Sequence, residues 1–193
     1  IFAGWASNSK YAVLGSLRTC AQMISYEIPM GFSVIGVVML AHSMSLLDIV
    51  EAQAGLWNVV YQPLGFFVFF VAGLAEAQRI PFDLPEAEGD LCAGYHTEYS
   101  GIRFSFFMIS EYLIVVFLSA LIVLLFFGGW HGILIPLPPV VWFLLKLSFF
   151  IWVFMWLRFT FPRYRYDQLM SIGWKVLLPL SLANILISGI FML

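Results

Sequence analysis

Long apolar segments dominate this sequence and constrain its fold more than any other feature. A helix needs about 20 apolar residues to cross the hydrocarbon core of a bilayer. We therefore predict an all-α, polytopic transmembrane helical bundle with about five spans, forming a single domain over residues 1–193. The segments that meet the length requirement are Leu17–Ala41, Val59–Gln78, Phe104–Phe127, Val140–Thr160 and Ile172–Met192.

The composition excludes an ordinary soluble domain. Hydrophobic residues make up 62% of the chain and charged residues only 10%, and the mean hydropathy is +0.96. Soluble domains carry about 25% charged residues. The formal net charge of −2 gives no basis for nucleic-acid binding. Cys20 and Cys92 lie far apart in no CxxC pattern, so neither a disulfide framework nor a metal or cluster site is indicated.

The basic residues predict how the bundle is oriented. The connections at residues 43–57 and 128–139 contain no Lys or Arg. The positive-inside rule assigns the basic side to the cytoplasm or its equivalent, so we predict cytoplasmic loops at about residues 79–103 and 161–171. Eight of the nine basic residues fall on that side: Lys10, Arg18, Arg79, Arg103, Arg158, Arg163, Arg165 and Lys175.

Four ionisable residues lie inside predicted spans: Glu27, Glu76, Glu111 and Lys146. Such residues cost several kcal/mol on insertion and indicate function by default. With a rise of 1.5 Å per residue, the glutamates lie at depths of roughly 14, 5 and 10 Å from the inner face, in that order. Lys146 falls in the outer half. Carboxylates at graded depths can conduct protons; the alternative is that each pairs with a polar group on a neighbouring helix. Pro29 removes a helical hydrogen bond beside Glu27, which favours a hydratable kink.

The loop from Arg79 to Arg103 is acidic. It holds five of the chain's eleven carboxylates: Asp83, Glu86, Glu88, Asp90 and Glu98. A charge run usually means a solvated face, and composition alone does not distinguish that from a functional loop.

Sequence motifs give a sharper indication. The string Pro-Phe-Asp-Leu-Pro-Glu-Ala-Glu at Pro81–Glu88, preceded by Arg79, resembles the signature of one membrane subunit of complex I, called the H subunit in bacteria and subunit 1 in mitochondria. Further stretches resemble the same family in the same order along the chain: Gly4–Ala12, Arg18 with Ala21–Glu27, Phe106–Tyr112 and Pro162–Met170.

The resemblance implies a subunit of a proton-translocating NADH:quinone oxidoreductase, an enzyme. In that enzyme the chain would help form the quinone chamber and couple quinone reduction to proton translocation. The implied substrate is ubiquinone or menaquinone, with NADH, FMN and iron–sulfur clusters held by partner subunits and no cofactor or metal held by this chain alone. The implied partners are the peripheral-arm quinone-site subunits, neighbouring membrane subunits and the lipid bilayer. Because the family has further helices before Gly4, we expect that the N-terminal spans are missing here. The motifs favour a bacterial inner membrane over a mitochondrial one.

The resemblance also implies roles for particular residues. The family's carboxylate chain carries over to Glu27, Glu76, Asp83, Glu86, Glu88 and Glu111, to which we add Lys146 as an intramembrane charge. The chamber or docking candidates are Arg18, Arg79, Phe104, Phe106, Phe107, Arg158, Arg163 and Arg165. Packing or lipid contact is the alternative for the phenylalanines, and pairing with Asp167 is the alternative for Arg165.

Two other functions remain open from the sequence. One is the homologous membrane subunit of a membrane-bound hydrogenase or formate hydrogenlyase, which uses no quinone. The other is a stand-alone ion transporter, which would show inverted repeats and broken helices in both halves. Neither feature is evident in the sequence.

Overall fold

The computed structural model describes residues 2–83, 98–132 and 138–192, which form helices and no strand. Helical segments that are long and apolar enough to cross a membrane are α2 (Lys10–Ala41), α7 (Ile102–Phe126), α8 (Pro139–Thr160) and the continuous stretch Tyr166–Phe191. The predicted all-α membrane bundle is confirmed.

Shorter helices complete the described part of the chain. They are α1 (Phe2–Ala6), α3 (Leu46–Ala52), α4 (Asn58–Tyr61), α5 (Pro63–Glu76), α9 (Tyr166–Ile172), a π-helical turn η2 (Gly173–Leu177) and α10 (Leu178–Met192). The last three run on from one another and form the final span.

The second predicted span is interrupted, because the helix stops at Gln62 and starts again at Pro63. Gln62 has φ −131° and ψ 64°, outside the helical region. Proline lacks a backbone N–H and pushes the preceding residue away from helical geometry, which explains the break. The 14 residues of α5 extend about 21 Å, less than the hydrocarbon core of about 30 Å.

Two other boundaries differ from the prediction. α2 begins at Lys10 instead of Leu17 and continues as a helix through Pro29. α9 begins at Tyr166, so the connection after α8 is shorter than the predicted loop at 161–171. The backbone N–H of Arg165 donates to the side-chain oxygen of Gln168 at 3.4 Å, in a capping box that starts the helix early.

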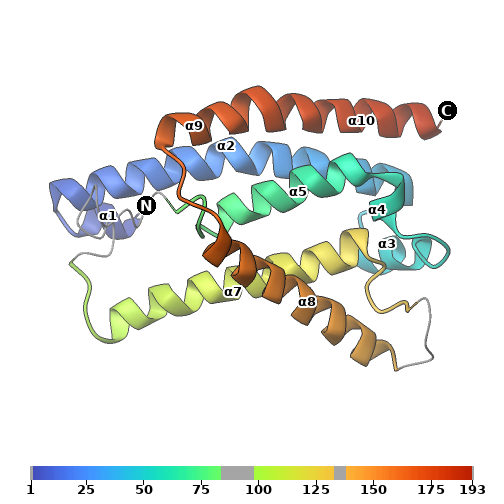
Figure 1. The fold of residues 1–193 in the computed structure, drawn as a ribbon, viewed down its shortest axis with the longest axis horizontal. Helices are drawn as coiled ribbons and strands as arrows, with labels where there is room; N and C mark the ends of the chain where they lie inside the picture. Colours follow the sequence, from blue (N-terminus) through green and yellow to red (C-terminus); the bar gives the residue numbers. More distant parts are fainter. Residues whose placement is uncertain (1, 84–97, 133–137, 193) are drawn as a thin grey trace.

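The helices alternate in direction along one long axis (Figure 1). α2, α5 and the α9–α10 segment lie side by side, α7 lies beyond α5, and α8 crosses α7 at an angle. The beginnings of α2, α7 and α9 lie toward one end of the molecule, which we call the inner end because the predicted cytoplasmic residues fall there. The opposite, outer end holds α3, α4 and the end of α10.

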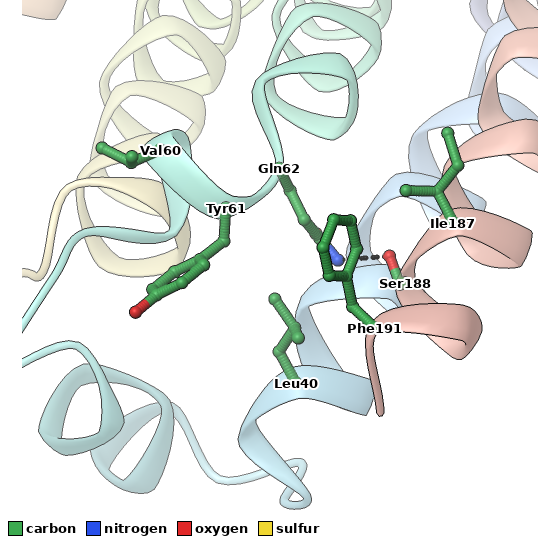
Figure 2. A pocket seen from close by; sticks show the side chains of 7 residues that line it. All are labelled: Leu40, Val60, Tyr61, Gln62, Ile187, Ser188 and Phe191. Atoms are coloured by element: carbon green, nitrogen blue, oxygen red, sulfur yellow. Dashed lines mark hydrogen bonds between the residues drawn. The ribbon is translucent and has the colours of Figure 1, made fainter. Parts of the chain in front are cut away.

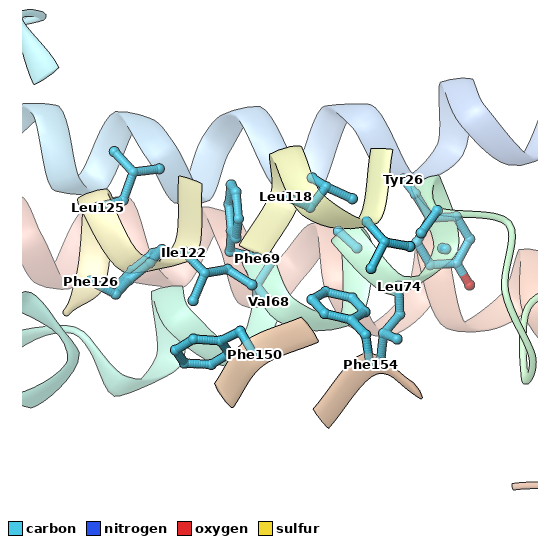
Figure 3. Packing of buried hydrophobic residues seen from close by; sticks show 14 of the residues in the cluster. Tyr26, Val68, Phe69, Leu74, Leu118, Ile122, Leu125, Phe126, Phe150 and Phe154 are labelled. Carbon is cyan, nitrogen blue, oxygen red and sulfur yellow. The ribbon is translucent and has the colours of Figure 1, made fainter. Parts of the chain in front are cut away.

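An aromatic and aliphatic core joins α5, α7 and α8 (Figure 3). The rings of Phe69 and Phe126 lie 5.6 Å apart, and those of Phe70 and Phe154 lie 5.4 Å apart. Along α8 only Lys146, Phe150 and Phe154 are buried. This four-residue spacing is one stripe of a helix, so α8 packs on the bundle through a single face.

Candidate functional site

A buried ion pair joins the end of α5 to α7. The chain leaves α5 through Gln78, which has φ 50°, and this left-handed turn directs Arg79 back into the bundle. Nη2 of Arg79 lies 3.3 Å from Oε2 of Glu111, and both side chains are 8% exposed. The Arg79 guanidinium also lies 4.5 Å from the centre of the Tyr112 ring. Two opposite charges are therefore held out of solvent, each neutralising the other.

A second ion pair links the two inner connections. Nη2 of Arg163 lies 3.3 Å from Oδ2 of Asp83, whose side chain is 10% exposed. The backbone N–H of Tyr164 donates to the carbonyl of Pro81 at 3.1 Å. The Phe82 and Tyr164 rings stack with centres 5.8 Å apart. The segment that follows α5 and the segment that precedes α9 thus form one joined surface.

Gln22 fastens this surface to α2. Its side-chain Nε2 donates to the carbonyls of Ala75 and Phe82, both at 2.8 Å, and the residue is fully buried. The sequence prediction did not include Gln22, because it rested on charged side chains. A carboxamide inside an apolar span is costly to bury without partners. Gln22 could therefore have been recognised in the sequence as an unusual intramembrane residue, like the charged ones.

Glu27 and Glu76 form the remaining part of the inner-end site. Glu76 is half-buried in the last turn of α5, and its Oε2 accepts no hydrogen bond from the described residues. Glu27 is exposed on α2, in an open groove lined by Ile24, Ile28 and Gly31 among others. The two carboxylates are close enough for their charges to interact.

We refer to Glu27, Glu76, Arg79, Asp83, Glu111 and Arg163 as the inner-end cluster. These predicted residues come from four separate parts of the chain: α2, the end of α5 with the segment after it, α7, and the segment before α9. Glu86 and Glu88, also predicted, lie outside the described residues.

Lys146 does not join this cluster. Its ammonium group donates to the carbonyls of Phe127 at 2.6 Å, Gly129 at 3.1 Å and His131 at 2.7 Å. It also lies 4.7 Å from the centre of the Trp57 ring. All three ammonium hydrogens therefore have acceptors, and the cation sits at the carboxyl-terminal end of α7, where the helix dipole favours positive charge.

The predicted phenylalanines lie in the first turns of α7. Phe104 and Phe106 are exposed, and Phe107 is half-buried with its ring 5.2 Å from that of Tyr99. Their exposure fits either lipid contact or a passage completed by a partner, so their role stays a prediction.

The remaining predicted arginines occupy separate positions. Arg18 is half-buried on α2, Arg158 is half-buried in the last turn of α8, and Arg165 is exposed just before α9. Within residues 2–83, 98–132 and 138–192, no group of three or more His, Cys, Asp or Glu side chains is arranged to hold a metal ion.

The sequence is similar to those of known proteins along almost its whole length. The model of the NADH dehydrogenase family matches residues 1–189. The second H-type subunit of NADH-quinone oxidoreductase from Rhizobium meliloti (strain 1021) is 81% identical over 190 residues, covering 98% of this chain and 58% of that protein. Its counterpart from Rhizobium etli is 79% identical over 192 residues, covering all of this chain and 56% of that protein. The first H-type subunit from Geobacter metallireducens is 58% identical over 187 residues, covering 96% and 56%. The chain spans a little over half the length of these relatives.

Proposed function

The chain belongs to the NADH dehydrogenase family, and from this premise we propose that it is the quinone-site membrane subunit of a proton-translocating NADH:quinone oxidoreductase. In this role it helps form the quinone chamber and couples quinone reduction to proton translocation. The observation that carries the proposal is the inner-end cluster, in which a buried ion pair and a second ion pair follow Glu76 at the end of α5. The names of the relatives favour this function over the hydrogenase alternative.

Quinone reduction supplies the driving event. A quinone takes up two electrons and two protons to become a quinol, and negative charge builds on its oxygens before the protons arrive. In this proposal the electrons come from iron–sulfur clusters in partner subunits. This chain positions the quinone, places charged groups near it and transfers protons.

The negative charge that builds on the quinone acts on the Arg79–Glu111 ion pair. A guanidinium responds to a new anion by sharing its charge between the anion and its original partner. The charge of the buried Glu111 is then only partly compensated. Glu76 is the last residue of α5, three positions before Arg79, and Glu27 interacts with it, so the change passes to the next carboxylates.

The other predicted residues complete this proposal. Asp83, Glu86 and Glu88 connect the quinone side to the membrane carboxylates. Arg163 and Arg165 are exposed on the inner connection and suit electrostatic docking of a peripheral-arm subunit. The remaining chamber or docking residues in this proposal are Arg18, Phe104, Phe106, Phe107 and Arg158. The membrane is the bacterial inner membrane.

Purification through an affinity tag on the intact protein tests the assembly. We expect a mild-detergent extract to contain flavin, iron–sulfur clusters and NADH:quinone reductase activity. Isolation with a nickel-containing hydrogenase, or without any redox partner, would overturn the proposal. The same preparation identifies the bound quinone as ubiquinone or menaquinone.

A further inference from the structure

A second polar cluster lies at the outer end of the bundle, remote from the ion pairs. Gln62, Asn184 and Ser188 are 4%, 2% and 2% exposed, and they come from the α4–α5 break and from α10. Nε2 of Gln62 donates to the carbonyl of Gly36 at 2.9 Å and to Oγ of Ser188. Oγ of Ser188 in turn donates to the backbone carbonyl of Asn184 at 2.7 Å. We call Gln62, Asn184 and Ser188 the outer polar cluster.

Two complementary atoms of this cluster have no partner among the described residues. Oε1 of Gln62 is a buried acceptor without a donor, and Nδ2 of Asn184 is a buried donor without an acceptor. In an apolar environment, polar atoms of this kind are strongly driven to find a hydrogen bond. A single small molecule that both accepts and donates satisfies the two together.

The distances around Gly36 show that these two atoms lie near each other. A Cβ added to Gly36 would lie 2.6 Å from Nδ2 of Asn184 and 3.2 Å from Oε1 of Gln62. A Cβ added to Gly65 would also lie 2.9 Å from Nδ2 of Asn184. Both amide atoms therefore lie within 3.2 Å of one point beside Gly36, and the two glycines leave room for the Asn184 carboxamide in a tightly packed interior.

A pocket adjoins the cluster at the outer end. Its volume is about 280 Å³, and its lining combines Gln62 and Ser188 with apolar side chains that include Leu40 and Phe191. Figure 2 shows Gln62 and Ser188 facing each other among these side chains. Since one water occupies about 30 Å³ of liquid, the pocket has room for several waters next to the buried Gln62 amide.

We propose that the outer polar cluster is a hydration site, in which water from the outer-end pocket bridges Oε1 of Gln62 and Nδ2 of Asn184. The chemistry favours water over an ion, because the cluster offers amide and hydroxyl groups and no charged side chain. It favours water over a lipid chain at the bridging position, because both orphaned atoms require a hydrogen-bonding partner. The proposal does not depend on the redox function of the inner end.

Cysteine reactivity tests whether water reaches the site. The matched pair is Ser188→Cys and Ser181→Cys, in a background that carries Cys20→Ser and Cys92→Ser. Both serines are buried on α10, two helical turns apart. In the intact complex in nanodiscs, which expose both faces, a small water-soluble thiol reagent should modify Ser188→Cys at least about tenfold faster, because only a hydrated thiol ionises to the reactive thiolate.

Equal, slow modification of the two cysteines in an assembled complex would overturn the proposal. If either variant fails to assemble, a map of the wild-type complex that resolves ordered water tests the hydration site instead. We expect density within hydrogen-bonding distance of both amides, and its loss in Asn184→Leu. A direct Gln62–Asn184 hydrogen bond, or a continuous lipid chain between the two side chains, would refute the hydration site.

Discussion

Arg79 and Glu111 form a buried ion pair with an N–O distance of 3.3 Å, and the pair links the turn after α5 to the inner half of α7. The two residues lie far apart in sequence and meet only because the turn after α5 packs against α7. The pair therefore holds two distant segments together. Removing either charge destabilises the fold, because the other is left buried and uncompensated.

We predict that breaking this pair destabilises the protein more than removing it altogether. Arg79→Met or Glu111→Leu alone should cost about 3–5 kcal/mol, whereas the double variant should cost clearly less because no buried charge is left alone. Unfolding of the purified complex, followed by heat or denaturant, gives the comparison. Glu51→Leu is the control, since Glu51 is exposed at the outer end. Additive losses in the double variant would contradict the coupling.

The Asp83–Arg163 pair should behave differently, because the Arg163 side chain is 37% exposed. Solvent screens such a pair, and its contribution to stability is about 0–1 kcal/mol. Arg163→Gln should leave the unfolding midpoint nearly unchanged but weaken association with the peripheral arm, most strongly at low ionic strength. Salt-dependent dissociation of the arm measures this. A large loss of stability with unchanged docking would show that Arg163 is structural.

Lys146 provides a test between two roles. If its ammonium group serves to clamp the end of α7, Lys146→Met should lower stability by roughly 2–4 kcal/mol, because three carbonyls lose a charged donor. The assembled variant should still translocate protons at the wild-type ratio. Lys175→Met is the control, since Lys175 is exposed. Normal stability with lost translocation would instead place Lys146 in the proton path.

Gln22→Leu should loosen the inner surface without abolishing assembly. The substitution removes the hydrogen bonds to Ala75 and Phe82 while keeping a side chain of similar size. Hydrogen exchange of the backbone amides in residues 79–83 should then become faster, because opening this segment no longer breaks those contacts. Unchanged exchange there would show that the aromatic contacts of Phe82 hold the segment by themselves.

The spans could be predicted from sequence because hydropathy depends mainly on local composition. Hydropathy did not reveal the break at Gln62–Pro63, which follows from the effect of proline on the preceding residue, or the early start of α9 at Tyr166, which depends on a local cap. α2 continues as a helix through Pro29, and the hydratable kink expected beside Glu27 stays a prediction.

For the candidate site, the sequence indicates which ionisable residues are unusual but not which of them pair. Ionisable residues inside apolar spans are rare and costly, so they can be recognised from the sequence. Which charges meet depends on how distant helices pack: Arg79 reaches α7, while Asp83 reaches the connection before α9. The buried amides of Gln22, Gln62 and Asn184 carry no charge and were not predicted, although the cost of burying them in an apolar bundle follows from the same physics.

The proton-to-electron ratio tests the central claim most directly. Complexes carrying Glu27→Gln, Glu76→Gln or the control Glu51→Gln would be reconstituted in liposomes and driven by NADH and quinone. We predict that the first two variants assemble, reduce an artificial acceptor from NADH at the wild-type rate, and lose quinone reduction or proton translocation several-fold, while Glu51→Gln retains both. Wild-type quinone reduction with a wild-type proton-to-electron ratio in both inner-end variants would contradict the account.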